Sequence, residues 1–312
     1  MSITLQVLPA VTVSWETFQA CAPPFSIALD GYVSGGPRFN GAGPWVTFNH
    51  HEEVDRLATR STCAQVLMAI RQGLFQTFRD TAGDHAVVWV NDCDEDVCLS
   101  WTLLKHHYLA TSTMNPALNR LVAMEDALDC TAGAYPFPID LPMLQELAWV
   151  FQNYRQFRLS GQLAKLDPAA YGLVIANVEE RILAHVMGRG GSIPLDVRYD
   201  RIGGGTGWAM VREIGAQART AMFADGIRAF LAVTELPSGR WSYVFGKMSP
   251  FVPIDLVAFM AEMNRTEPGW GGGDSVGGSP RGVGSSKPPE EVARVFEEVA
   301  RAGVRKPVVP RG

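Results

Sequence analysis

The chain has 312 residues, more than one compact core usually holds, so its length favours two domains over one. Apolar residues make up 47% of the sequence and charged residues 19%, which is the composition of an ordinary globular protein. The formal net charge of -5 excludes a general electrostatic attraction to nucleic acid, although a local basic patch is compatible with it.

The cysteines and the first residues indicate the compartment. Five cysteines, an odd number without a CxxC pair, are typical of a reduced, cytosolic protein. The opening MSITLQVLPA lacks the charged region and the long apolar region of a signal peptide. No window of about 18 apolar residues occurs, so we expect no membrane-spanning segment and no membrane partner. The sequence therefore predicts a cytoplasmic protein.

The first half of the chain alternates short apolar runs with helical patterns. The runs at residues 25–29, 45–48 and 85–90 are continuously apolar, which is typical of parallel strands covered on both faces. Residues 61–80 and 95–107 have helical spacing, the first of them after a Ser/Thr start. The order strand, strand, helix, strand, helix predicts an α/β domain with a parallel sheet.

A fourth strand and a helical region complete the predicted first domain. The strand is expected at residues 119–125, NRLVAME, and residues 141–188 are mainly helical in pattern. The glycine-rich stretch GRGGSIP, residues 188–194, is the best candidate for a boundary. We therefore expect a metal-binding α/β domain at residues 1–190 and a second domain at residues 191–312.

The second domain is predicted to be a smaller α+β unit that binds the substrate. A hairpin is expected to turn at Pro237, Ser238 and Gly239, between two strand-like runs. Residues 269–286 form the most glycine-rich segment, and little more than one helix follows it, so a linker is not the favoured interpretation. Helices are predicted at residues 207–226, 254–264 and 289–303.

Polar side chains of the kind that bind metals follow the predicted strands. Because the carboxyl ends of parallel strands meet at one edge of a sheet, these side chains are expected to converge. Imidazole and carboxylate groups without a thiolate suit Mn²⁺ or Mg²⁺ better than structural zinc. Each set alone also fits a polar loop, or a helix N-terminus where carboxylates favour the dipole. The residues concerned are Asp30, His50, His51, Asp92, Asp94, Asp96, Asp126 and Asp129.

Several of these segments together resemble the DHH phosphoesterase superfamily. The stretch from Asp30 through Asn49, His50 and His51 into the helix at 61–80 is similar to its lone aspartate and Asp-His-His motif. NDCDEDVCLSWTLLK resembles its Asp-x-Asp motif, and MEDALDCTAGAY resembles its later aspartate motif. GWGGGDSVGGSPRG is similar to the glycine loop of the DHH-associated C-terminal domain. The resemblance covers nearly the whole chain.

Two features depart from the family pattern. The Asp-x-Asp motif follows the histidine pair instead of preceding it, as if the sheet were circularly permuted. Asn49 stands where the family has an aspartate, and Asp274 or Ser275 stands where its C-terminal loop has a histidine. Asn49 accepts a hydrogen bond but brings no charge, so an aspartate there is expected to retain or raise metal affinity.

The resemblance implies a centre that holds two Mn²⁺ or Mg²⁺ ions. The glycines would let backbone N–H groups approach an anion, and an arginine would add a charged contact to phosphate. The implied metal ligands are Asp30, His50, Asp92, Asp94 and one of Asp126 and Asp129. The implied catalytic residues are Asn49, His50 and His51, of which His51 orients the site or donates a proton to the leaving group. The implied substrate-binding residues are Gly272, Gly273, Gly277, Gly278, Ser279 and Arg281.

The implied function is metal-dependent hydrolysis of a phosphate ester or anhydride, in a small phosphorylated molecule or a short oligonucleotide held between the domains. One alternative is a non-catalytic protein on the same fold that senses a nucleotide or phosphate through Arg281, an interpretation that Asn49 favours. Another is an enzyme or assembly subunit that acts on a different substrate with one metal or none. The oligomeric state is also open, a homodimer included.

Overall fold

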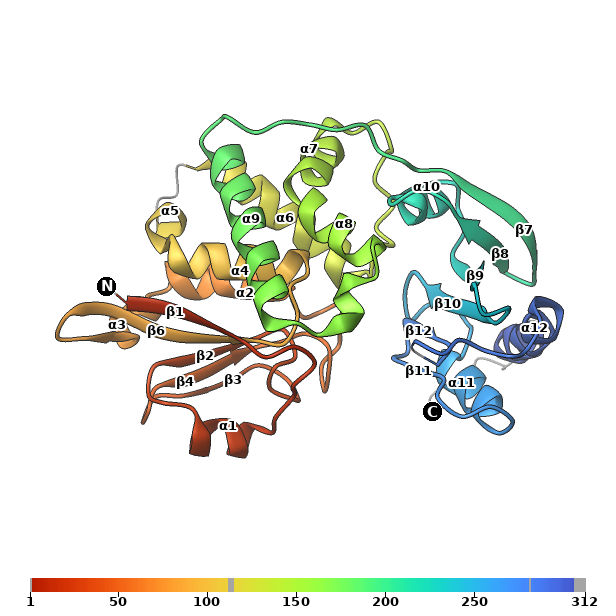
Figure 1. Ribbon diagram of the computed structural model, residues 1–312, viewed down its shortest axis with the longest axis horizontal. Coiled ribbons are helices and arrows are strands. Elements are labelled where there is room, and N and C mark those ends of the chain that lie inside the picture. Colours follow the sequence, from red (N-terminus) through yellow and green to blue (C-terminus); the bar gives the residue numbers. More distant parts are fainter. Residues whose placement is uncertain (1, 112–114, 281, 306–312) are drawn as a thin grey trace, which may run out of the picture. The chain divides into compact units, whose positions relative to one another are not determined.

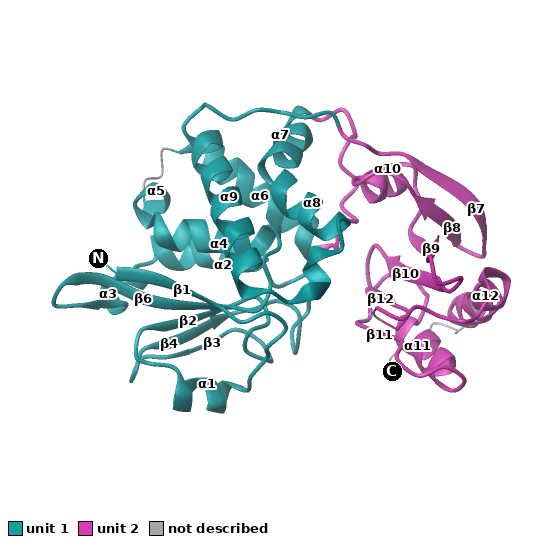
Figure 2. Ribbon diagram, in the orientation of Figure 1, with its two compact units in different colours: residues 1–130, 142–194 teal, residues 131–141, 195–312 magenta. Residues whose placement is uncertain are grey.

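The chain forms two compact units (Figure 2), seen in a computed structural model that describes residues 2–111, 115–280 and 282–305. One unit contains residues 1–130 and 142–194, and the other contains residues 131–141 and 195–312. Segment 131–141 thus belongs to the second unit, although the boundary expected near residue 190 placed it in the first domain. Among the described residues, no helix has the length and apolar character that crossing a membrane requires.

The first unit is built on a mostly parallel sheet (Figure 1). Neighbouring strands β1/β6, β6/β2 and β2/β4 are parallel, and β3 runs antiparallel to β4. The three expected strands are confirmed as β2, β4 and β6, and their carboxyl ends lie at the same edge. β1, which was not foreseen, pairs along its whole length with β6. The strand order is β1 (Ser2–Val7), β6 (Gly83–Val90), β2 (Ser26–Leu29), β4 (Trp45–Phe48) and β3 (Arg38–Asn40), with β5 (Arg79–Asp80) pairing with β6.

Helices cover both faces of this sheet, which explains why its central strands are apolar (Figure 1). On one face, Phe18 of α1 (Trp15–Cys21) packs against Ala28 of β2. The other face is covered by α2 (Thr62–Arg71), α4 (Glu95–Lys105) and α9 (Pro168–Val186). The unit also contains α3 (Leu74–Thr77), α5 (His107–Thr111), α6 (Pro116–Cys130), α7 (Pro142–Val150), α8 (Gln152–Leu159) and the 3-10 helix η1 (Gln162–Lys165).

Helices α2 and α4 begin at the edge where the strands end. Ser61 caps α2, and its Oγ accepts a hydrogen bond from the N–H of Ala64. Asp94 caps α4 in the same way, because its Oδ1 accepts from the N–H of Val97 at 2.9 Å. Both helices start where the sequence predicts but end before residues 80 and 107. The first stops ahead of Gly73, whose φ of 100° is left-handed.

The strand predicted at residues 119–125 is wrong, because these residues lie inside α6. Its buried side chains recur three and four residues apart, at Leu118, Leu121, Val122 and Glu125. The run of apolar letters that suggested a strand is therefore one face of a helix, packed against α2 and α4. Asp126 and Asp129 accordingly come from a helix and not from a strand end.

The second unit is built on a mostly antiparallel sheet. The hairpin of β9 and β10 is confirmed, with Glu235 opposite Trp241 next to the turn. The helix predicted at 207–226 is wrong in its first half, where β8 forms, and right only in α10 (Ala218–Ala224). The strand order is β11 (Gly271–Gly272), β12 (Val276–Gly278), β10 (Trp241–Lys247), β9 (Ala229–Glu235), β8 (Trp208–Glu213) and β7 (Tyr199–Gly205).

Alternation along β9 divides the core of the second unit into two layers. Leu231 faces α11 (Leu256–Asn264) and α12 (Pro289–Arg305), the two other expected helices, in a cluster that includes Phe259. The next residue, Ala232, belongs to the opposite layer, which contains α10 and Ala134 of segment 131–141. The expected α+β architecture is therefore present, as a sheet with helices on both faces.

Candidate metal centre

Two of the expected ligands stand at the ends of adjacent parallel strands. Asp30 directly follows β2, and His50 lies two residues after the end of β4. Asp30 has a φ of 50°, in the left-handed region that non-glycine residues rarely adopt. Its N–H still donates to the Phe48 carbonyl at 2.9 Å, so the turn begins where the sheet ends. Backbone strain of this kind persists where the surrounding structure holds it and concentrates at functional sites.

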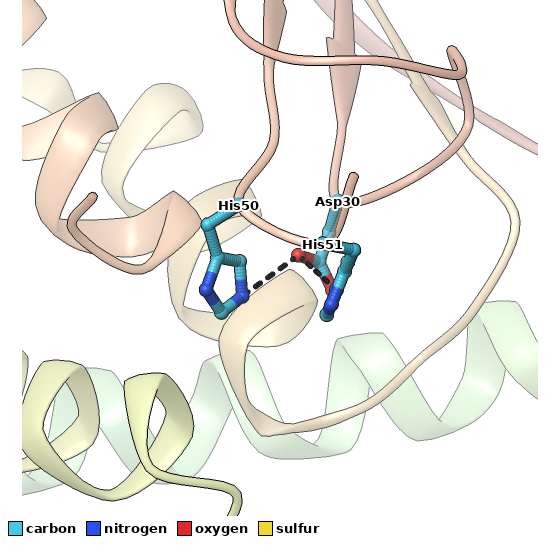
Figure 3. Close-up of side chains that lie close together, drawn as sticks. All are labelled: Asp30, His50 and His51. Atoms are coloured by element: carbon cyan, nitrogen blue, oxygen red, sulfur yellow. Dashed lines mark ion pairs between the residues drawn. The ribbon is translucent and has the colours of Figure 1, made fainter. Parts of the chain in front are cut away.

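Asp30 lies close to both His50 and His51 (Figure 3). Its Oδ1 lies 2.9 Å from Nε2 of His51 and 3.5 Å from Nε2 of His50. The two imidazole rings come within 4.4 Å of each other, measured between centroids. His50 is fully buried, whereas 35% of the His51 side chain is exposed. His50 therefore lies in the interior of the protein, whereas His51 is partly accessible to solvent.

A second group shares His50 and adds two aspartates from helices. Nε2 of His50 lies 2.6 Å from Oδ2 of Asp129 on α6 and 3.8 Å from Oδ2 of Asp96 on α4. The 2.6 Å contact lacks hydrogen-bond geometry. Neither ring nitrogen of His50, nor Oδ2 of Asp129, makes a hydrogen bond within the described part of the chain, although all three atoms are buried. Buried polar atoms without partners are costly, so a cation bound by both Nε2 of His50 and Oδ2 of Asp129 would stabilise the site.

The N-terminus of α2 donates hydrogen bonds to both Asp30 and Asp96. The N–H groups of Thr62 and Cys63 donate to the two carboxylate oxygens of Asp96, at 2.7 and 2.6 Å. The Thr62 hydroxyl donates to Oδ1 of Asp30 at 2.8 Å. The helix thus fixes both carboxylates with donors that carry only partial positive charge. Asp96 therefore holds α2 in place as well as facing His50.

The carboxyl groups of Asp30 and Asp96 differ in their proton affinity. Burial alone would raise the pKa of Asp30, but His51, with His50 and Thr62, lowers that pKa to about 2. Burial alone would lower the pKa of His51, but the charge of Asp30 and the hydrogen bond to it raise that pKa. For Asp96, burial and then the charges of Asp129 and Asp30 raise the pKa well above its usual range.

Negative charge is crowded around this site. Burial, and then the charges of Glu95 and Asp129, raises the pKa of Glu125, and its Oε2 makes no hydrogen bond within the described residues. Burial, and then the charges of Asp30 and Asp92, likewise raises the pKa of Asp94 well above its usual range. Burial and neighbouring like charges therefore both favour the protonated form of these carboxyl groups unless a cation neutralises the charge.

Two overlapping groups could therefore hold metal ions. Asp30, His50 and His51 form one group, and His50, Asp96 and Asp129 form the other. In each group the ligand atoms lie within 4.8 Å of one another, a span that direct bonds of about 2.0–2.2 Å to one ion can bridge after small adjustments. The donor set is imidazole and carboxylate, which fits the expected Mn²⁺ or Mg²⁺ without identifying the ion.

Three of the expected ligands lie outside both groups. Asp94 bonds to its own helix as the cap of α4, and Oδ1 of Asp92 accepts from the N–H of Cys93 at 2.7 Å. Oδ1 of Asp126 accepts from the N–H of Ser61 at 2.7 Å, and its Oδ2 lies 3.2 Å from Nη1 of Arg60. Of the expected ligands, the structure brings together Asp30, His50 and Asp129.

Asp96 and Thr62 were not in the ligand set drawn from the sequence. Asp96 was one of the aspartates after the strand, but the family resemblance favoured Asp92 and Asp94. Capping preference could have separated them, because an aspartate just before a helix usually bonds to that helix. Asp94 occupies the cap, which leaves Asp96 in the first turn, directed into the buried side of α4. Nothing in the sequence indicates that Thr62 reaches Asp30.

Asn49 makes its bonds to the backbone. Its Nδ2 donates to the carbonyls of Gly35 at 2.8 Å and Val33 at 3.3 Å, and its Oδ1 accepts from the N–H of His51 at 3.1 Å. The side chain is fully buried. Asn49 therefore ties the loop after β2 to the turn that carries the histidines, and it needs an amide donor to do so.

The glycine-rich segment of the second unit is an ordered part of the sheet. Gly277 and Gly278 pair with β10 on one side and β11 on the other. Gly272 has a φ of 145°, and a Cβ there would lie 2.3 Å from Cα of Gly277, so close strand packing requires glycine. Ser279 Oγ accepts from the N–H of Tyr243 at 3.0 Å. Of the other expected substrate contacts, Gly273 lies between the two short strands and Arg281 lies outside the described residues.

No protein-family model matches this sequence, and a comparison with curated proteins also finds no match.

Proposed function

We propose that the protein is a metal-dependent phosphohydrolase that cleaves a phosphate ester or anhydride in a small phosphorylated molecule or a short oligonucleotide. The observation that supports this most directly is His50, a fully buried imidazole shared by two groups of carboxylates, with neither ring nitrogen hydrogen-bonded in the described chain. The resemblance of the motifs to the DHH phosphoesterases supports the reaction class.

In this proposal the buried residues bind the cations and the exposed histidine meets the substrate. Asp30, His50, Asp96 and Asp129 would hold Mn²⁺ or Mg²⁺. Bound divalent cations would polarise a phosphoryl oxygen and stabilise the charge that develops on it. His51 is held by Asp30 and partly exposed, so its ring is the group that a leaving oxygen can reach for a proton.

The glycine-rich region is proposed to bind phosphate through Ser279 and Arg281, as predicted from the sequence. The main chain of the preceding glycines is paired in the sheet, so these glycines would support the binding segment rather than contact the anion.

The first test measures Mn²⁺ binding and hydrolysis of bis(p-nitrophenyl) phosphate by the full chain. Asp129→Asn removes a ligand charge and is expected to weaken Mn²⁺ binding by more than about tenfold and to abolish hydrolysis, since even indirect changes at metal sites cost about 10–100-fold. The matched control is Asp80→Asn, which alters another aspartate facing a histidine in the same unit, 3.7 Å from Nδ1 of His85.

The outcomes separate the candidate functions. Tight Mn²⁺ binding by the wild type and by Asp80→Asn, with hydrolysis in both, supports the proposal. Metal binding without hydrolysis of any phosphate ester or anhydride tested favours the non-catalytic phosphate-binding protein. Absence of Mn²⁺ and Mg²⁺ binding in calorimetry, with the chain folded, would overturn the proposal.

A further inference from the structure

Glu125 is an acidic side chain on the buried face of α6. Only 3% of the residue is exposed, and its buried Oε2 makes no hydrogen bond within the described residues. A glutamate rarely lies in a protein interior unless something pairs with it, because burying an uncompensated carboxyl group is costly. The other buried side chains on this face, those of Leu118, Leu121 and Val122, are apolar. Glu125 therefore occupies a position where packing alone would favour an apolar residue.

The spacing along α6 places Glu125 beside the second ligand group. Glu125 and Asp129 are four residues apart, so their side chains lie on the same side of the helix, one turn apart. The helix packs against α2 and α4, and α4 carries Asp96. Burial, and then the charges of neighbouring acids, Asp129 and Asp96 among them, raise the pKa of Glu125. The three carboxyl groups therefore lie within electrostatic reach of one another.

Several buried atoms in this part of the first unit lack a hydrogen bond. Within the described residues they are both ring nitrogens of His50, Oδ2 of Asp129 and Oε2 of Glu125. A single unpaired atom can be a packing defect. An imidazole nitrogen and two carboxylate oxygens left open in one region are instead the kind of atoms that bind Mn²⁺ or Mg²⁺ and the waters of its shell.

The arginine that acts on Glu125 is bonded to another acid. Arg155 donates from Nε to Oε1 of Glu95 at 2.6 Å and from Nη2 to Oε2 of Glu95 at 3.1 Å. Such a two-pronged contact matches the geometry of one carboxylate. The guanidinium is thus directed at Glu95, and Oε2 of Glu125 is left without a partner in the described chain.

We propose that Glu125 is a further acidic residue of the cation site, where it holds a water molecule of the ion that His50, Asp96 and Asp129 bind. This inference deepens the proposed function and rests on its cation site, but not on hydrolysis. Glu125 belongs to neither group of ligand atoms that lie within 4.8 Å of one another, so a water and not a direct bond is assigned to it. Mg²⁺ suits this arrangement, because it usually keeps several waters when it binds to a protein.

The test measures the Kd of Mn²⁺ by calorimetry and the urea unfolding of the metal-free protein, both with the full chain. Glu125→Gln keeps the shape of the side chain but cannot become an anion. We expect it to weaken Mn²⁺ binding about tenfold, as for other groups that orient a ligand without touching the ion. The unfolding midpoint without metal should stay the same or rise, because a neutral amide replaces an acid among like charges. A merely structural role would instead lower that midpoint and leave the Kd unchanged.

The matched control is Asp126→Asn, which removes a negative charge from the next residue of α6. Oδ1 of Asp126 accepts from the N–H of Ser61 at 2.7 Å, a contact that asparagine can keep, and Oδ2 lies 3.2 Å from Nη1 of Arg60. Because this charge is already paired outside the ligand groups, the Kd of Mn²⁺ should stay within about twofold of the wild type. An equal loss of affinity in both variants would show a general electrostatic attraction and would overturn the role of Glu125.

The remaining outcomes separate this inference from the proposed function. Wild-type Mn²⁺ affinity in a folded Glu125→Gln would overturn the inference and leave the proposed function standing. A folded wild type that binds neither Mn²⁺ nor Mg²⁺ would overturn both. If Glu125→Gln does not fold, Glu125→Asp withdraws the carboxylate by one methylene and must weaken Mn²⁺ binding, and an unchanged Kd in that variant would overturn the inference.

Discussion

At the scale of single residues, the sequence and the structure indicate different roles for Asn49. From its place before two histidines, it is expected to act like a weaker aspartate. In the structure its Nδ2 donates to the carbonyls of Val33 and Gly35. An aspartate has no donor to offer them when ionised, and it would bring a buried negative charge against two carbonyl oxygens.

Asn49→Asp is therefore expected to destabilise the protein by about 2–4 kcal/mol, as for two buried acceptors left unpaired. The expectation that this change retains or raises metal affinity stays a prediction, and the loss of stability is expected in addition. Urea unfolding measures it. The control is Asn40→Asp, because Asn40 is bonded through Oδ1, which accepts from the N–H of Ala42, and a carboxylate can do the same. Equal midpoints for the two variants would contradict the assignment.

At the scale of elements, the ends of helices and strands make most of the specific contacts. In the second unit, Glu297 of α12 bonds to the turn between β7 and β8. It accepts hydrogen bonds from Nε1 of Trp208 at 2.7 Å and from the N–H and the hydroxyl of Thr206, both at 2.8 Å. Arg301, one turn along α12, donates to it at 2.6 Å. One carboxylate thereby connects the edge hairpin to the last helix.

This contact predicts a pH dependence of stability. Burial alone would raise the pKa of Glu297, but the hydrogen bonds from Trp208, Thr206 and Arg301 lower it from 4.5 to about 2. A depressed folded pKa stabilises the protein above the unfolded pKa, and the contribution is lost as pH falls from about 4.5 towards 2.

Glu297→Gln should therefore lower the free energy of unfolding at pH 7, and the difference from the wild type should shrink at pH 3. Denaturant unfolding at both pH values, followed by the tryptophan fluorescence of the chain, measures this. Glu298→Gln is the control, because among the described residues Glu298 pairs only with Arg294, at the exposed surface. A difference that is the same at both pH values would show that the carboxylate charge is not the cause.

At the scale of the whole molecule, both candidate ligand groups lie in the first unit. A cation that binds only the folded state stabilises it by about 2.7 kcal/mol at a hundred times its Kd. Mn²⁺ should therefore slow amide hydrogen exchange in β2, β4, α2, α4 and α6. Exchange in β9 and β10 of the second unit should not change, which mass spectrometry of the exchanged chain can check. Equal protection of both units would show that the ion binds elsewhere.

The sequence by itself determined the parts of the site that depend on local pattern. A continuously apolar run followed at once by a polar residue marks a buried strand and its end, so β2, β4 and β6 with Asp30 and His50 could be predicted. The hairpin, α11 and α12 followed from turn residues and periodicity, whereas the helix predicted at 207–226 was right only in α10. The kinship with the DHH phosphoesterases stays a prediction, since its motifs are degenerate and family comparison gives no match.

Only the tertiary structure decided which side chains complete the site. Asp129 reaches His50 because α6 packs on α2 and α4, and Asp96 was selected over Asp94 because capping uses the first of these carboxylates. The two hydrogen bonds that Asn49 donates also depend on chain segments that are distant in sequence. The same holds for segment 131–141, which belongs to the second unit. Local pattern fixes the period and the ends of an element, but the identity of its neighbours is set by the packing of the whole core.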